Sequence, residues 1–168
     1  VNDTLHGGDG DDYVSGDAGD DELYGDAGND TIWTISGHDT VYGGDGNDSI
    51  DDQVGEMTAI YNSYYDGGTG NDTIWAGGGV DTILGGDGDD VIYGEGGNDV
   101  LTGGAGDDTF GFWANSGADT INDFDMGDDD ADGRTNDQLD VSQLRDLGNN
   151  PVDWQDVTVS DDGSGNAV

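Results

Sequence analysis

A nine-residue repeat dominates this sequence and limits the folds open to it. From Gly7 the chain reads GGDGDDYVS, GDAGDDELY, GDAGNDTIW, TISGHDTVY and GGDGNDSID, and from Gly67 it reads GGTGNDTIW, AGGGVDTIL, GGDGDDVIY, GEGGNDVLT and GGAGDDTFG. Self-similarity at a fixed period is typical of a solenoid, in which each unit contacts only its neighbours. The sequence therefore predicts a stack of small units in place of a globular core.

Two positions of the unit keep their chemistry throughout. The eighth position is apolar in all ten units: Val14, Leu23, Ile32, Val41, Ile50, Ile74, Ile83, Ile92, Leu101 and Phe110. The sixth position is Asp in all ten: Asp12, Asp21, Asp30, Asp39, Asp48, Asp72, Asp81, Asp90, Asp99 and Asp108. A truncated unit before the first complete one adds Asp3. A solvated acidic face has no reason to recur in one phase of nine, so we interpret these aspartates as metal ligands.

Each unit predicts a glycine-rich turn followed by a very short strand. Glycines adopt backbone conformations closed to other residues and let carbonyl groups approach a ligand. Side chains alternate along a strand, so only the eighth position points inward. Two units per coil would stack these residues between two parallel sheets and align the aspartates along both edges. Oxygen ligands at that spacing suit Ca²⁺ better than Mg²⁺, which demands stricter octahedral geometry.

These units resemble the hemolysin-type calcium-binding repeat of the RTX family, GGxGxDxUx with U a large apolar residue. The resemblance implies an all-β fold, a right-handed parallel β-roll, with calcium held by sixth-position aspartates of two turns and by turn carbonyls. It places Asp3, Asp21 and Asp39 on one edge and Asp12, Asp30 and Asp48 on the other, and it sets Asp72, Asp90 and Asp108 opposite Asp81 and Asp99. It also implies roughly eight ions. Sites near the departures Thr34-Ile35, Ala76 and Val80 are expected to be weak or missing.

Composition supports a chain that needs a cation to fold. Asp and Glu number 40 against 2 Lys and Arg, which gives a formal charge of −38. Such a chain cannot offset its ordering entropy without metal. The charge excludes nucleic acid and anionic membranes as partners, since both need basic surface. No apolar run approaches membrane-spanning length, and there is no cysteine for disulfides or thiolate metal sites.

Four segments follow from the phase of the repeat. Residues 1–51 form the first block of the roll, 52–66 an insertion, 67–111 the second block, and 112–168 a C-terminal flank. The fifteen-residue insertion is expected to replace one unit with a six-residue bulge, so that the edges keep their alternation. Its apolar cluster either covers the roll or binds a partner, and cover is the preferred interpretation. The ninth-position aromatics are expected to point outward, where stacking between coils is favoured over sugar binding.

The flank is expected to be a β-rich cap that closes the open end of the roll. Asp119 and Ile121 retain the repeat pattern, which adds Asp119 to the candidate ligands. Asp128, Asp130 and Asp132 precede a glycine as in the first half of an EF-hand-type loop, although its twelfth position is Leu139, with Asp140 as a substitute. An isolated calcium loop is favoured here over a merely acidic turn.

The sequence predicts no catalytic activity, because carboxylate pairs are everywhere and no patterned nucleophile accompanies the two histidines. The leading hypothesis is a calcium-driven folding module of a larger, secreted or cell-surface protein that uses type I secretion machinery. The alternative is a structural or adhesive segment that self-associates, as in an S-layer or filament. Binding of surface glycans is a further alternative. Ice binding is disfavoured, since only Thr69 and Asn71 supply the polar pair that it requires.

Overall fold

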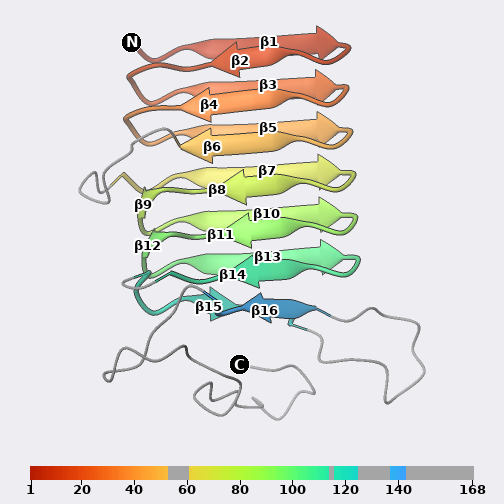
Figure 1. The fold of residues 1–168 in the computed structure, drawn as a ribbon. Coiled ribbons are helices and arrows are strands. Elements are labelled where there is room, and N and C mark those ends of the chain that lie inside the picture. The colour runs from red at the N-terminus through yellow and green to blue at the C-terminus, as the bar shows by residue number, and fades with distance from the viewer. Residues whose placement is uncertain (53–60, 114–115, 125–136, 143–168) are drawn as a thin grey trace.

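Two parallel sheets, stacked coil upon coil, form the body of the molecule (Figure 1). The computed structural model describes residues 1–52, 61–113, 116–124 and 137–142. Sheet A contains β1 (Thr4–Asp9), β3 (Glu22–Ala27), β5 (Thr40–Asp45), β7 (Tyr64–Thr69), β10 (Thr82–Asp87), β13 (Val100–Ala105) and β15 (Thr120–Ile121). Sheet B contains β2 (Tyr13–Ser15), β4 (Thr31–Thr34), β6 (Ser49–Asp52), β8 (Thr73–Trp75), β11 (Val91–Tyr93), β14 (Thr109–Gly111) and β16 (Gln138–Asp140).

Consecutive units alternate between the two sheets, and strands of each sheet pair with the strand two units away. Leu23 pairs with Val41 in sheet A, and Ile32 pairs with Ile50 in sheet B. Every pairing is parallel among the described residues, where no helix occurs. A short third sheet joins β9 (Gly78–Gly79) to β12 (Gly96–Gly97). The predicted all-β parallel roll is confirmed.

The core is a column of side chains between the sheets. All ten eighth-position residues are buried, with Val14 the most exposed at 6%. Their neighbours in the strands face outward, because side chains alternate along a strand. Tyr65, which the repeat pattern did not identify, also lies in this column, where it pairs with Val41 and Ile83 in the neighbouring coils.

The insertion preserves the alternation of the sheets. Thr40 of β5 pairs with Tyr64 of β7, whereas Glu22 pairs with Thr40 in the preceding coil. The first pair is therefore six residues further apart in sequence than the second, as a six-residue bulge requires. Residues 53–60 lie outside the described part of the chain, and the interpretation of the insertion as cover remains a prediction.

The described parts of the C-terminal flank add a further coil to the roll. Ile121 of β15 pairs with Leu101, and Leu139 of β16 pairs with Phe110. Phe124 packs on Phe110, with ring centroids 6.0 Å apart. These side chains cover the end of the core column. Among the residues that the structure describes, no helix has the length and apolar character needed to cross a membrane.

Candidate metal centres at the edges of the roll

The turns that lead from sheet A to sheet B form one edge of the roll, the A-to-B edge, on the right in Figure 1. Each turn ends in an Asp immediately before a sheet B strand. The residues stacked there are Asp12, Asp30, Asp48, Asp72, Asp90, Asp108 and Asp137. This edge is therefore an unbroken column of carboxylates.

The opposite turns, from sheet B to sheet A, form the B-to-A edge. Its sixth positions are Asp3, Asp21, Asp39, Ser63, Asp81, Asp99 and Asp119. Ser63 interrupts this column, because the insertion supplies a hydroxyl where every other unit supplies a carboxylate. The two edges consequently differ in the middle of the roll.

From the second coil onward, Oδ1 of each sixth-position carboxylate accepts a hydrogen bond from the backbone of the preceding coil. The N–H of Asp12 donates to Oδ1 of Asp30 at 2.8 Å, and the N–H of Asp72 donates to Oδ1 of Asp90 at the same distance. On the other edge the N–H of Asp81 donates to Oδ1 of Asp99 at 2.9 Å. These bonds satisfy backbone donors that would otherwise be buried without a partner.

The second oxygen of many of these carboxylates is buried and carries no hydrogen bond within the described residues. This holds for Oδ2 of Asp12, Asp30, Asp48, Asp72, Asp81, Asp90 and Asp99. A buried carboxylate oxygen without a donor or cation is costly, so these atoms are the strongest sign of a missing positive charge.

The first glycine of each A-to-B turn lies directly against this second oxygen. A Cβ on Gly25 would come 2.5 Å from Oδ2 of Asp30 and would also collide with the carbonyl oxygen of Gly43 on the next coil. A Cβ on Gly67 would collide in the same way with Asp72 and the carbonyl of Gly85. Carboxylate and carbonyl oxygens of adjacent coils therefore converge on a space that only glycine leaves open.

Burial shifts the protonation of these aspartates. Desolvation raises the pKa of Asp48 and Asp108 to about 6 and that of Asp72, Asp81 and Asp90 to about 7. Hydrogen bonds from the backbone oppose the rise in pKa, and neighbouring aspartates add to it. Without a cation, the folded roll thus favours the neutral acids.

The donor set fits a hard divalent cation. Across the described ranges, no three His, Cys, Asp or Glu side chains converge on one point. A cation on either edge would therefore be held by the sixth-position carboxylates together with backbone carbonyl oxygens. Oxygen ligands on glycine turns, without nitrogen or sulfur, are those that Ca²⁺ prefers.

The fifth position carries a second ladder that the sequence analysis did not identify. Oδ1 of Asn47 accepts from the N–H of Asn71 at 2.8 Å, and Oδ1 of Asn71 accepts from the N–H of Asp89 at 3.0 Å. A fifth-position side chain thus accepts from a backbone N–H of the following coil, whereas a sixth-position side chain accepts from a backbone N–H of the preceding coil. The near-constant Asn or Asp at this position was the available signal. The side chain of Val80 has no acceptor, so it breaks the ladder on the B-to-A edge.

The flank contributes one candidate that the sequence analysis missed. Oδ1 of Asp137 accepts from the N–H of Asp108 at 3.1 Å, and Leu139 lies in the core position of the same coil. Residues 137–140 (DQLD), which the sequence analysis placed at the end of an EF-hand-type loop, thus follow the DxUx part of the repeat pattern. Asp119 ends the other column, accepting from the N–H of Asp99 at 3.0 Å. Asp128, Asp130 and Asp132 lie outside the described residues.

Outward aromatic rings stack between coils. Tyr24 and Tyr42 on sheet A have centroids 5.0 Å apart and planes 13° apart, and Trp75 and Tyr93 on sheet B are 5.9 Å and 2° apart. His6 extends the first row, with its centroid 4.4 Å from that of Tyr24. Rings that face one another in this way leave fewer ring faces for a sugar, so the structure favours stacking between coils.

A parallel β-roll with carboxylates and glycine carbonyls aligned on its edges defines a calcium-binding solenoid. The family model of the RTX calcium-binding nonapeptide repeat matches four times, over residues 2–32, 36–51, 61–90 and 76–110, which together cover more than half of the chain. The chain belongs to this RTX repeat family. A search of curated proteins found no match.

Proposed function

We propose that this chain is the calcium-dependent folding module of a larger exported protein. Seven Oδ2 atoms carry the proposal, because they are buried and without a donor in the described residues: those of Asp12, Asp30, Asp48, Asp72, Asp81, Asp90 and Asp99. Calcium binding is the property that defines the repeat family. What we propose in addition is that calcium binding drives the folding of this chain and supports its export. The sixth-position aspartates of both edges, with Ser63 excluded, are the proposed ligands.

The charge of the chain explains why folding would wait for metal. The roll brings carboxylates of successive coils into register, within a chain whose formal charge is −38. Roughly eight calcium ions would supply about sixteen positive charges and relieve much of this repulsion. Because the ion binds the folded form, metal loading and folding become one equilibrium.

The residues have separate roles in this equilibrium. Oδ1 of each Asp holds the preceding coil through its backbone N–H, while Oδ2 faces the ion. The first glycine keeps the space open, and the carbonyl of the next coil completes the approach from the other side. The bound cation supplies the positive charge that these oxygens lack.

Export follows from the same dependence. In a cytoplasm with little free calcium, the chain would remain unfolded and fit to pass through a type I secretion channel. Outside the cell, calcium near the ~10⁻⁴–10⁻³ M range typical of extracellular modules would fold it. The proposed location is therefore extracellular or at the cell surface, with no catalytic role for this segment.

A calcium titration from EDTA, followed by circular dichroism and light scattering, tests this proposal. We expect a cooperative rise in β signal with calcium and none with magnesium at equal concentration. A chain that is fully folded in EDTA at neutral pH would contradict the proposal. Scattering that grows with calcium would instead support association of rolls in a structural or adhesive role.

A further inference from the structure

We propose that the two edges bind calcium unequally, and that a hydroxyl cluster around Tyr65 replaces the metal on the B-to-A edge between Asp39 and Asp81. The inference rests on the proposed calcium function but concerns this chain's own departures from the repeat. The A-to-B edge would then be the one continuous metal column of the described roll.

Ser63 removes the sixth-position carboxylate of this turn. Its hydroxyl accepts the N–H of Asp39 at 3.1 Å, which is the structural task of Oδ1 in other units. Its own N–H donates to Oδ1 of Asp81 at 2.7 Å, so the backbone ladder passes through without a break. Ser63 has no second oxygen, however, and therefore offers nothing that corresponds to Oδ2 of an aspartate.

Side-chain atoms also fill the space that glycine leaves open elsewhere. The first positions of the two flanking turns are Thr34 and Ala76 in place of glycine, and their exposed fractions are 1% and 0%. On the other edge a Cβ at the equivalent Gly43 or Gly67 would collide with the Asp Oδ2 and with the carbonyl of the next coil. The Ser63 turn itself begins with Asp52, which pairs with Thr34 and whose carboxylate lies against Gly77. The glycine-lined space that fits a cation on the A-to-B edge is therefore not repeated around Ser63.

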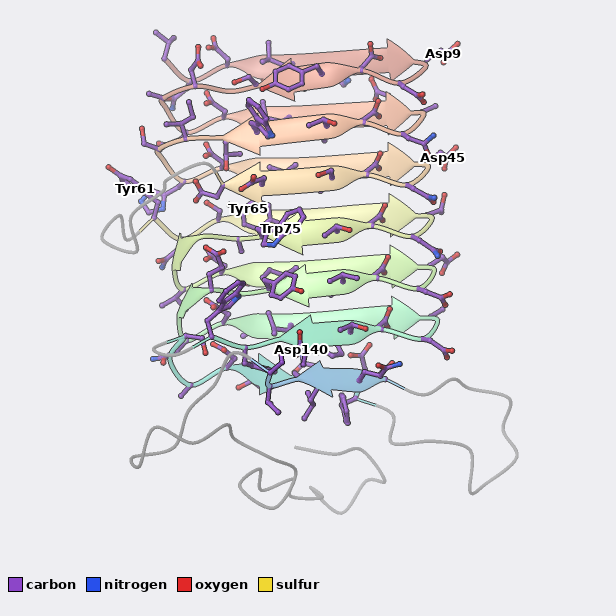
Figure 2. All side chains as sticks on the ribbon, viewed as in Figure 1. Asp9, Asp45, Tyr61, Tyr65, Trp75 and Asp140 are labelled. Atoms are coloured by element: carbon purple, nitrogen blue, oxygen red, sulfur yellow. The ribbon has the colours of Figure 1, made fainter. Side chains whose placement is uncertain are left out.

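Tyr65 places a neutral hydroxyl among these residues. The side chain is fully buried, and its hydroxyl donates to the carbonyl oxygen of Ala76 over a long 3.4 Å. In the A-to-B turns, the carbonyl of the corresponding first residue converges with a carboxylate on the open space. The hydrogen bond from the phenol therefore uses the Ala76 carbonyl oxygen, which would otherwise be available as a metal ligand. Figure 2 shows Tyr65 on the fourth coil, in β7.

The surroundings keep this phenol protonated and give it other partners. Burial raises the pKa of Tyr65 far above its usual value, and Asp52 and Asp81 raise it further. The hydroxyls of Thr34 and Ser63 lie near enough to oppose that rise. Oγ1 of Thr34 is buried and has no other partner within the described residues, so its hydroxyl can donate to the phenol oxygen. Hydroxyls rotate to donate or accept, and the three O–H groups can satisfy one another without a cation.

Counting bound calcium in matched variants tests the proposal. Equilibrium dialysis against calcium, with metal measured by mass spectrometry, would be applied to the full chain, Ser63→Ala, Tyr65→Phe and Asp72→Ser. Asp72→Ser places the Ser63 chemistry on the A-to-B edge and is the matched control. We expect Ser63→Ala and Tyr65→Phe to bind as many ions as the parent chain, and Asp72→Ser to bind fewer.

Thermal unfolding in saturating calcium gives an independent readout. Tyr65→Phe keeps the ring but removes the hydroxyl, so its melting temperature should fall by about 2–4 °C while its ion count stays the same. Loss of an ion in Ser63→Ala or Tyr65→Phe would overturn this inference but leave the proposed function intact. An unchanged ion count in Asp72→Ser would also overturn it, because serine would then suffice for the metal. A parent chain that binds no calcium would instead overturn the proposed function on which it rests.

Discussion

The backbone N–H of Asp48 donates to Oδ1 of Asp72 at 2.7 Å, although 24 residues separate the two in the chain. Elsewhere on this edge, as between Asp30 and Asp48, the same bond spans 18 residues. The longer interval contains the insertion, which leaves the coil on this edge undisturbed. The A-to-B column therefore continues through both blocks of repeats.

Replacing Asp48 with Asn should weaken calcium-driven folding. Asn keeps an oxygen that can accept from the N–H of Asp30 but removes the charge that faces the ion. We expect the calcium midpoint for folding to rise by about tenfold, equivalent to ~1.4 kcal/mol. Circular dichroism during a calcium titration measures this midpoint. Asp45→Asn is the control, since Asp45 lies in the same turn but is exposed at its outer rim (Figure 2); an equal effect there would point to net charge alone.

Gly43→Ala should destabilise the loaded roll without straining the backbone. Gly43 does not have a positive φ, yet an added Cβ would collide with Oδ2 of Asp48 and the carbonyl of Gly67. We expect a loss of about 1–3 kcal/mol in the free energy of unfolding in saturating calcium. Denaturant unfolding measures it. On the other edge Ala76→Gly is the counterpart, and a larger loss there than at Gly43 would contradict the inequality of the edges.

Acid should partly replace calcium in folding the chain. The folded roll raises the pKa of Asp48 to about 6 and of Asp72 and Asp90 to about 7, against an ordinary value of 3.8. A raised folded pKa stabilises the fold below the ordinary value, and this stabilisation is lost as pH rises through about 6 to 7. In EDTA, β signal should therefore increase as pH falls from about 7 to 4. With calcium present, acidification over the same range should release metal, because protons compete for the same oxygens. Metal-free chain whose β content falls on acidification would contradict this prediction.

Removing the amide of Asn71 should weaken the contact between two coils. Its Oδ1 accepts from the N–H of Asp89, and Asn71→Ala leaves that donor without its partner. We expect a cost of about 1 kcal/mol in saturating calcium, with little change in the number of ions bound. Denaturant unfolding and calcium dialysis separate the two effects. A lost ion would show that the fifth position acts on the metal directly.

Much of the fold follows from the period of nine, for a physical reason. Alternate units repeat every 18 residues, so Leu23 and Val41 must meet once two units make one coil. The same reasoning places Asp30 beside Asp48. The parallel sheets, the core column and the alignment of the edges could all be predicted from that spacing.

The remainder depends on residues that satisfy the geometry with different chemistry. Ser63 accepts the backbone bond that Asp accepts elsewhere, and Tyr65 fills the core with a ring that also carries a hydroxyl. Neither residue fits the nine-residue repeat pattern, so the sequence analysis assigned both to the insertion. Asp137 was missed because 29 residues, and not 18, separate it from Asp108. A loop of any length can return to the next coil, and periodicity says nothing about where it does.

The inequality of the edges restricts how such a roll can change its length. Deleting a single nine-residue unit would transfer every later unit to the opposite edge, which would bring turns such as that of Ala76 into the continuous column. Deleting two units would leave each turn on its own side. Residues can enter a turn in any number, as the six extra residues between Thr40 and Tyr64 do. Whole coils are therefore the smallest pieces that this architecture can gain or lose without exchanging its two sides.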